Sequence, residues 1–190
     1  MKKIELLQIL SEKTSKCVKC HELVANRTQV VFGEGNPNAK ILLLGEASGQ
    51  TEDELGRQFV GPAGQLLNNI LKACEINRED VFITNVCLCR PPRNRTPTDN
   101  EANNCSIYLK YQIQIVNPKF IVCLGATACR NLLKLYHAMG YLRGKWFKYE
   151  DAHVHADVLC TYHPSFALRN GEKIKKEIWD DLQTLMEKNT

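Results

Sequence analysis

The 190-residue chain has no long apolar run, and no stretch approaches the roughly eighteen consecutive apolar residues of a membrane-spanning helix. Its opening segment, MKKIELLQILSEK, carries too many charges for a secretory signal peptide. We therefore expect a soluble, cytoplasmic protein for which no membrane is a partner.

The sequence also lacks an internal repeat, a low-complexity tract and an interdomain linker. A chain of this length is large enough to bury one core and is short for two domains. Its 44% hydrophobic and 24% charged residues are ordinary proportions for a globular protein, and its net charge of +4 selects no class of partner. We expect a single domain over residues 1–190.

Cysteine, by contrast, is abundant, with nine residues. Cytosolic thiols stay reduced, so we expect metal ligation for some of these cysteines and plain burial for the others. Cys17, Cys20 and His21 form a C-x-x-C-H pattern, which occurs at c-type haem attachment sites, in half of a zinc or iron–sulfur site, and in redox dithiols. Haem attachment normally follows export, and the lack of a signal peptide argues against it.

Four short runs rich in Ile, Leu and Val predict strands near residues Lys40–Leu44, Val81–Thr84, Phe120–Leu124 and Val158–Thr161. These runs do not alternate cleanly between apolar and polar residues, which is typical of parallel strands covered on both faces. The segment YLRGKWFKYEDAHVHAD, before the last run, predicts a hairpin or loop.

Helical patterns lie between the runs. Pro62 suits a first helical position, Thr98 and Glu101 form a capping box for a helix that reaches Ile115, a third helix follows Gly125, and Lys173–Met186 is amphipathic. A further short helix at the N-terminus carries a leucine stripe made of Leu6, Leu7 and Leu10. This order predicts the α/β class: a three-layer α/β/α sandwich with a mostly parallel central sheet of about four strands.

The predicted strands end in residues with unusual chemistry. In open parallel sheets, ligands bind beyond the carboxyl ends of the strands. Here that edge gathers Gly45–Gly49, Asn85, Gly125–Thr127 and His163–Ser165. Small residues, a carboxylate, an amide and an imidazole therefore converge, which predicts a functional site.

Five motifs occur in the chain in a fixed order: GEGNPNAKILLLGEASG, GRQFVGPAGQLL, FITNVCLCRPPRNRTPTDNEANNC, VCLGATA and TYHPS. In this order and at this spacing they resemble the family 4, iron–sulfur-containing uracil-DNA glycosylases, and the resemblance covers nearly the whole chain. It implies the uracil-DNA glycosylase fold, an enzyme of base excision repair, and uracil-containing DNA as the partner of a monomeric protein.

The resemblance assigns four cysteines to a [4Fe–4S] cluster: Cys17, Cys20, Cys89 and Cys105. Their spacing suits a zinc ribbon poorly, because a second C-x-x-C is missing, whereas four thiolates suit an iron–sulfur cluster. Cys87 stands where the family usually has an aliphatic residue, so we expect a packed thiol. We expect burial for Cys74, Cys123, Cys129 and Cys160, which lie on apparent core faces.

His163 is the best candidate for chemistry, because Pro164 fixes the turn that carries it. In the enzymes that the chain resembles, this histidine lies beside uracil O2, where negative charge develops. The amide of Asn85 can accept from uracil N3–H and donate to O4, a pattern that cytosine reverses. The resemblance makes Phe59 the aromatic platform under the base.

Glu46 lies in GEASG with Gly45 and Ala47, and all three are expected at the uracil. A carboxylate on this turn can orient a water or stabilise a cationic sugar, and related families carry Asp or Asn where this chain has Ala47. Glu46 is therefore the second catalytic candidate, beside His163. Ser48 departs from the family's usual GEAPG, where a proline stands.

Two segments are expected to contact DNA. Arg90, Arg93 and Arg95 lie within a short loop and could contact phosphates, although such runs are commonly just solvated. The segment after His163 is expected to hold the base-displacing wedge; its DNA-contact candidates are Ser165, Phe166, Leu168 and Arg169.

The sequence thus predicts a monofunctional glycosylase that hydrolyses the N-glycosidic bond of deoxyuridine in DNA, releasing uracil and leaving an abasic site. No lysine stands out as a Schiff-base nucleophile. The alternative is a non-enzymatic iron–sulfur or zinc protein that binds nucleic acid on the same fold. A thiol redox protein using Cys17 and Cys20 leaves the strand-end motifs unexplained.

Overall fold

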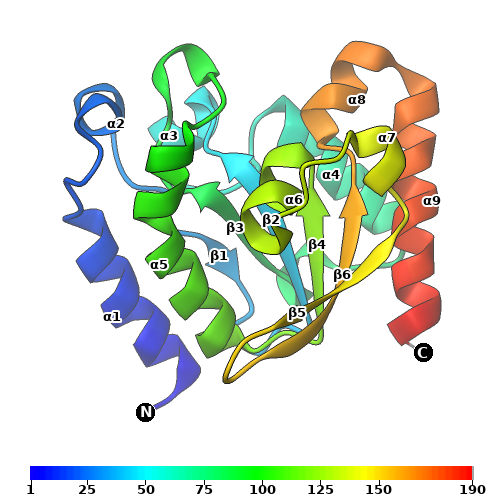
Figure 1. Ribbon diagram of the computed structural model, residues 1–190, viewed down its shortest axis with the longest axis horizontal. Helices are drawn as coiled ribbons and strands as arrows, with labels where there is room; N and C mark the ends of the chain where they lie inside the picture. The colour runs from blue at the N-terminus through cyan, green and yellow to red at the C-terminus, as the bar shows by residue number, and fades with distance from the viewer. Residues whose placement is uncertain (190) are drawn as a thin grey trace.

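The computed structural model describes residues 1–189 as three layers around one sheet, shown in Figure 1. Over these residues the sheet has six strands in the order β1-β3-β2-β4-β6-β5. Its four central strands are mutually parallel: β2 (Ile41–Ala47), β3 (Phe82–Cys87), β4 (Phe120–Leu124) and β6 (His155–Thr161). The mostly parallel α/β sandwich expected from the sequence is confirmed.

The expectation of about four strands is corrected by two short antiparallel edge strands. β1 (Glu34–Gly35) pairs with β3, and β5 (Trp146–Glu150) pairs with β6 as the predicted hairpin. β1 has only two residues, and β5 is half-exposed, so neither produces the apolar run that marks the central strands. The sheet thus ends in antiparallel strands that carry little burial signal.

The third strand also runs further than expected. Asn85 was expected to end it, but β3 continues to Cys87, with Asn85 opposite Gly45 and Cys87 opposite Ala47 on β2. Asn85 is therefore held in the sheet by its own backbone and by its neighbours. This setting fixes the direction of its side chain more tightly than a turn would.

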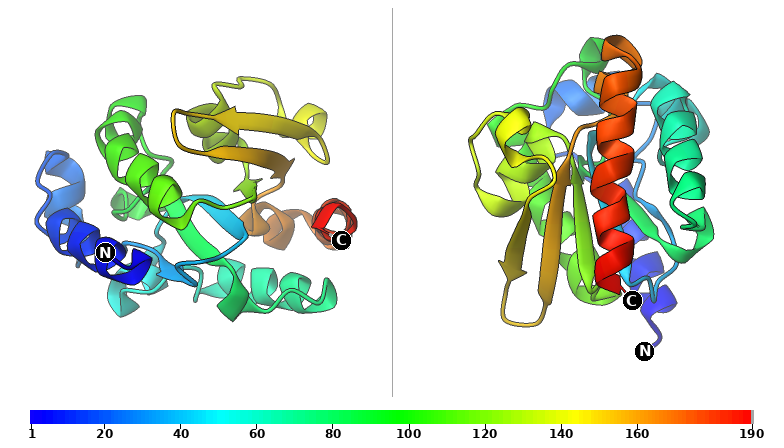
Figure 2. Two further views of the ribbon diagram at one scale, coloured as in Figure 1. Left: turned by 90° about the horizontal axis from the view of Figure 1, so that it is seen from below. Right: turned by 90° about the vertical axis from the view of Figure 1, so that its right-hand side faces the viewer.

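Helices cover both faces of the sheet, as the two views of Figure 2 show. One face packs against α1 (Lys3–Ser15), α5 (Asp99–Val116), α6 (Ala126–Leu133) and α7 (Met139–Leu142). The other packs against α4 (Pro62–Ala73), α8 (Pro164–Asn170) and α9 (Glu172–Asn189). The smaller helices are α2 (His21–Asn26), α3 (Gln50–Leu55), and the 3₁₀ turns η1 (Arg78–Asp80) and η2 (Pro92–Asn94).

The helix starts follow from local sequence. Thr98 Oγ1 accepts a hydrogen bond from Glu101 N at 3.2 Å, and Glu101 Oε2 accepts one from Thr98 N at 2.8 Å, so the predicted capping box begins α5.

In α1, Leu7 and Leu10 are buried, but Leu6 is 36% exposed. The N-terminal leucine stripe is therefore narrower than expected, because α1 covers only the edge of the sandwich.

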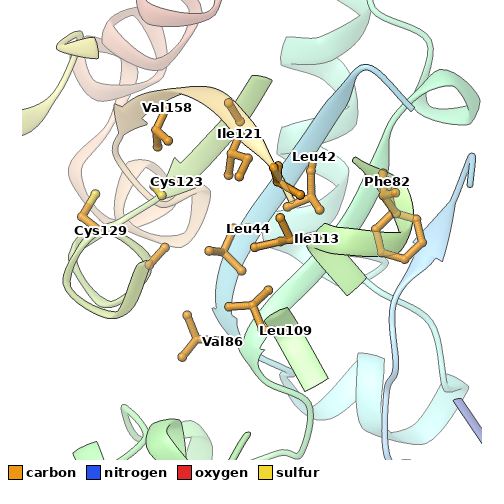
Figure 3. Packing of buried hydrophobic residues seen from close by; sticks show 14 of the residues in the cluster. Leu42, Leu44, Phe82, Val86, Leu109, Ile113, Ile121, Cys123, Cys129 and Val158 are labelled. Atoms are coloured by element: carbon orange, nitrogen blue, oxygen red, sulfur yellow. The ribbon is translucent and has the colours of Figure 1, made fainter. Parts of the chain in front are cut away.

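The core beneath α5 is built from alternate residues of the strands. In Figure 3, Leu42 and Leu44 of β2 point toward Ile113 and Leu109 of α5. The intervening Leu43 faces the opposite layer. The central strand is thus apolar on both faces, as expected for a parallel sheet between two helical layers.

Truncating the core side chain of Ile113 tests this packing. Ile113 is fully buried, so we expect Ile113→Ala to lower the free energy of unfolding by about 2–5 kcal/mol through lost burial and the resulting cavity. Urea unfolding measures the change. Ile107, on the same helix, is 38% exposed, so Ile107→Ala is the matched control and should lower the free energy of unfolding far less. Equal costs for the two variants would contradict the packing described.

Over residues 1–189, no helix combines the length and the apolar character needed to cross a membrane.

Candidate active site

A cavity of about 550 Å³ lies at the carboxyl ends of the four parallel strands. Most of the residues expected to act there do line it: Glu46, Ala47, Phe59, Asn85, Arg95, His163, Ser165, Phe166, Leu168 and Arg169. Gly45 lies just beneath its wall, against Asn85 and Phe59. The structure therefore brings most of these residues together around one cavity, although Arg90 and Arg93 are not part of its lining.

Asn85 presents an unpartnered acceptor in this cavity. Its side chain is 1% exposed, and its Nδ2 donates to Gln58 Oε1 at 2.7 Å. Its Oδ1 has no hydrogen-bond partner among the residues described. Leaving such an acceptor unsatisfied costs about 1–3 kcal/mol, so the site is built to receive a donor from a ligand.

Gly45 allows the amide of Asn85 to come this close to the neighbouring strand. A Cβ at Gly45 would stand 2.2 Å from Asn85 Oδ1 and 2.7 Å from Phe59 Cζ. Any larger residue would push the amide and the ring apart. Gly45 therefore acts by leaving room, rather than by lining the cavity itself.

The ring of Phe59 is carried by a strained backbone that its neighbours hold in place. Its φ is +49°, a left-handed conformation that costs a non-glycine residue about 1–3 kcal/mol. Arg78 donates to the carbonyls of Gln58 and Phe59. Glu52 Oε1 accepts hydrogen bonds from the backbone N–H groups of Val60 and Gly61, at 2.9 and 2.7 Å. At Gly64, a Cβ would lie 1.9 Å from Phe59 O, so α4 can pack directly on this loop.

His163 faces the ring of Phe59, with ring centroids 5.7 Å apart. Its Nδ1 accepts from Ser165 N at 3.1 Å and lies 2.8 Å from Ser165 Oγ. A backbone N–H can only donate, so Nδ1 is the unprotonated nitrogen and Nε2 carries the hydrogen. Burial, together with the nearby charge of Arg169, lowers the pKa of His163 to about 4. The imidazole is thus a neutral hydrogen-bond donor.

Glu46, at the end of β2, is oriented from the other side of the cavity. Thr127 Oγ1, in the first turn of α6, donates to Glu46 Oε2. No hydrogen bond to Oε1 is found within residues 1–189, so one carboxylate oxygen is held and the other is available. Ser48, next along this turn, is 2% exposed, and its Oγ has no partner in the same described region.

The three arginines of the loop after β3 have different surroundings. Arg95 is bound to two carboxylates: it contacts both oxygens of Glu101 at 2.8 Å and Glu22 at 2.9 Å. Its guanidinium therefore ties α2 to α5. Arg90 Nε donates to Asn94 Oδ1 at 2.8 Å, and Arg93 is exposed, with a φ of +53°.

The wedge candidates lie on α8 beside His163. The ring of Phe166 stacks on Tyr162, with centroids 5.1 Å apart, so it is held against the protein. Leu168 is an apolar side chain that is 46% exposed at the cavity. Among the apolar candidates, Leu168 is therefore the side chain exposed enough to insert into a bound partner.

The four cysteines expected to bind a metal group line one small cavity, and Cys87 lines it with them. Over residues 1–189, no three His, Cys, Asp or Glu side chains form a group that could hold a single metal ion. Cys87 is buried as expected but does not stand apart from the other four. A hydrogen bond with Cys105 is the main cause that raises the pKa of Cys87.

Several donors surround these thiols. Arg27 Nη1 donates to Cys89 Sγ at 3.0 Å, Leu88 N to Cys105 Sγ at 3.4 Å, and Asn104 Nδ2 to Cys20 Sγ at 3.5 Å. Burial raises the pKa of Cys89 to about 11, and Arg27 opposes that shift. Hydrogen bonds to sulfur are among the features that tune thiolate-bound clusters, so the residues present fit such a group.

Comparison with known proteins agrees with this geometry. Residues 32–183 match the family model described as the uracil DNA glycosylase superfamily. The chain belongs to this superfamily. The superfamily implied by the five motifs is thereby confirmed, and the cavity at the strand ends is the candidate active site of a uracil DNA glycosylase superfamily member.

Several curated relatives carry the name "Type-4 uracil-DNA glycosylase". The protein from Thermotoga maritima is 42% identical, over 94% of this chain and 92% of its own length. Those from Pyrobaculum aerophilum and Sulfurisphaera tokodaii are 42% and 39% identical, over 86% and 97% of this chain and 85% of each relative. Within the superfamily, the chain is therefore similar to type-4 members along most of its length.

Three side chains that support the site were not predicted from the sequence: Glu52, Gln58 and Arg78. Thr127 was expected at the site edge, but its hydrogen bond to Glu46 was not. Gln58 was in view within GRQFVGPAG, but its partners, Val31 and Asn85, are distant in the sequence. The Thr within VCLGATA, the second residue of α6, was the only signal for a partner of Glu46.

Proposed function

We propose that this protein is a monofunctional uracil-DNA glycosylase. It hydrolyses the N-glycosidic bond of deoxyuridine in DNA, releases uracil and leaves an abasic site for base excision repair. The observation that carries this proposal is the unpartnered Oδ1 of buried Asn85 in the cavity of a uracil DNA glycosylase superfamily member. Uracil offers a donor, N3–H, that fits this acceptor.

The flipped base stacks on Phe59 and is recognised by Asn85. Oδ1 of Asn85 accepts from N3–H, while Nδ2 donates to O4 with the hydrogen that Gln58 does not use. Stacking of a base on an aromatic ring is worth about 1–3 kcal/mol. Phe59 and Asn85 together therefore hold uracil with its glycosidic bond toward the cavity mouth.

His163 stabilises the leaving base. As the glycosidic bond breaks, negative charge develops on uracil O2, and the neutral imidazole donates Nε2–H to it. By analogy with oxyanion-hole donors, one such hydrogen bond is worth about 3–4 kcal/mol in the transition state. The lowered pKa of His163 keeps the ring neutral, so uracil departs as an anion and takes no proton from this group.

Glu46 acts on the sugar side of the reaction. Thr127 holds its Oε2, which leaves Oε1 to orient the attacking water or to face the positive charge that develops on the deoxyribose. Gly45 and Ala47 flank this carboxylate on β2, beneath and beside the base. The water adds to C1′ and releases its proton to solvent, the uracil anion is protonated from solvent, and the products are uracil and the abasic sugar.

The DNA approaches across the mouth of the cavity. Leu168 is the proposed wedge that fills the space of the displaced nucleotide, with Phe166 supporting it. Arg90, Arg93 and Arg169 are the proposed phosphate contacts. Arg169 and Ser165 line the cavity, whereas Arg90 and Arg93 lie on the loop after β3, outside its lining. Arg95 serves this surface by holding α2 and α5 together, because its guanidinium is already engaged by carboxylates.

A [4Fe–4S] cluster on Cys17, Cys20, Cys89 and Cys105 is proposed as the cofactor. The thiols line one cavity, and Arg27, Asn104 and a backbone N–H donate to three of them. When bound, the cluster supplies cross-linking rather than chemistry, because it joins the segment before α2 to the loop after β3 and to α5.

Removing one of these thiols tests the cofactor. We expect wild-type protein purified without oxygen to contain about four iron atoms per chain and to be brown. Cys89→Ser should lose most of that iron and colour, because an alkoxide is a poor substitute for a thiolate. Cys74→Ser removes a buried thiol outside this cavity and is the matched control. Zinc in place of iron, or full iron in Cys89→Ser, would contradict the assignment.

The activity itself is tested with oligonucleotides that contain one uracil. Incubation followed by alkali should cleave the strand at that position, whereas borohydride should trap no protein–DNA adduct, since no lysine attacks the sugar. Light scattering should give a monomer. If the protein with its cluster intact binds the DNA but releases no uracil, the non-enzymatic alternative is correct.

A further inference from the structure

We propose that Gln58 is a positioning residue that sets base selectivity, by fixing which end of the Asn85 amide faces the base. This inference rests on the proposed function and adds to it the origin of the choice between uracil and cytosine. Neither Asn85 nor Gln58 is a charged group. Selectivity therefore depends on how two amides are turned.

The direction of both amides is fixed by a backbone carbonyl. Gln58 Nε2 donates to Val31 O at 2.8 Å, and a carbonyl oxygen can only accept, so the NH₂ end of Gln58 must face Val31. Its Oε1 must then face Asn85, which donates Nδ2 to it at 2.7 Å. Asn85 Oδ1 is consequently the atom left without a partner.

The two possible orientations of the Asn85 amide have the same shape but opposite specificity. With Oδ1 toward position 3 of the base, the amide matches the N3–H and O4 of uracil. Turned by 180°, it would present Nδ2 to position 3 and match cytosine, which has an acceptor at N3 and an amino group at C4. Without Gln58 Oε1, nothing among the described contacts of Asn85 would distinguish these states.

The Val31 carbonyl, which orients both amides, belongs to a buried and hydrogen-bonded residue. Val31 is 1% exposed, and its N–H donates to Leu88 O at 2.8 Å. Gln58 is also 1% exposed, and its own carbonyl accepts from Arg78. The Val31 carbonyl and the Gln58 backbone are therefore both held in place.

Two substitutions of Gln58 separate positioning from packing. Gln58→Met keeps the volume and removes both polar ends. Gln58→Glu, when protonated at this buried position, keeps both, because its O–H donates to Val31 O and its carbonyl accepts from Asn85 Nδ2. The readout is inhibition of uracil release by free uracil and by free cytosine, together with kcat and KM on uracil-containing DNA.

We expect Gln58→Met to lower the preference for uracil over cytosine about tenfold or more, which corresponds to about 1.4 kcal/mol. Gln58→Glu should stay within about threefold of wild type, since two retained hydrogen bonds hold the amide. In an Asn85→Ala background, Gln58→Met should change the preference no further, because the group that it orients is gone. If Gln58→Met does not fold, Gln58→Asn, one methylene too short to span both partners, takes its place with the same expected loss.

A purely structural Gln58 would weaken uracil and cytosine equally and leave their ratio unchanged, and that result would overturn the inference. If the wild-type protein neither released uracil from DNA nor bound free uracil, the proposed function itself would be wrong. The two failures are therefore distinguishable.

Discussion

Replacing His163 with alanine is expected to lower the rate of uracil release by about 10²- to 10³-fold, the loss typical of removing one donor from a developing oxyanion. The reason is geometric: Nδ1 is occupied by Ser165, so Nε2–H is the donor left for the base. Single-turnover cleavage of a uracil-containing oligonucleotide measures the rate. His155→Ala, at the exposed start of β6, is the control and should match wild type.

The pH dependence gives an independent check on the same group. Because the pKa of folded His163 is lowered to about 4, its ring stays neutral from neutral pH down to about pH 5. The His163-dependent part of the rate should therefore be flat over that range. A loss of rate centred near pH 6.5, absent from His163→Ala, would show that the catalyst is an ordinary exposed histidine.

Asn85→Ala is the second large effect expected. It removes two hydrogen bonds to uracil from a side chain that is 1% exposed, and at about 1–1.5 kcal/mol each their loss should slow uracil release about 10²-fold. Stacking on Phe59 is retained, so binding of the DNA itself should change little. Single-turnover rates and DNA affinity, measured on the same protein, separate the two effects.

Asn38→Ala is the matched control for this variant, because Asn38 is exposed in the turn that precedes β2. Equal uracil release by Asn85→Ala and Asn38→Ala would show that the buried amide does not read the base. The proposed activity could still stand, but its site would have to lie elsewhere.

The fold was largely predictable because its four parallel strands are apolar on both faces. Phe120–Leu124 was predicted residue for residue, since β4 is buried along its whole length. The edge strands gave weaker signals for the converse reason: β1 and β5 have one unpaired side and little burial, so β1 was missed and β5 was predicted only as a hairpin or loop. Burial on both faces leaves a mark in the sequence, and edge pairing does not.

The candidate site was predicted as far as single residues at strand ends reveal it. Asn85, His163 and Glu46 all stand after apolar runs, where a polar residue is conspicuous. The supports of the site gave no such signal. Gln58 depends on Val31, twenty-seven residues away, and Arg95 gains its carboxylate partner Glu22 from seventy-three residues away. Contacts of this kind exist only once the chain has folded.

The left-handed Phe59 has a consequence for how substrate is received. Its loop is held by Arg78, which also pairs with Glu34 at 2.8 Å, and by Glu52. The proposed aromatic platform is thus ordered before any DNA arrives, and its conformational entropy is lost during folding rather than during binding. A nucleotide leaving the helix already has to give up its stacking. It then meets a surface that needs no ordering of its own, so capture can be completed within the brief time that the base is out.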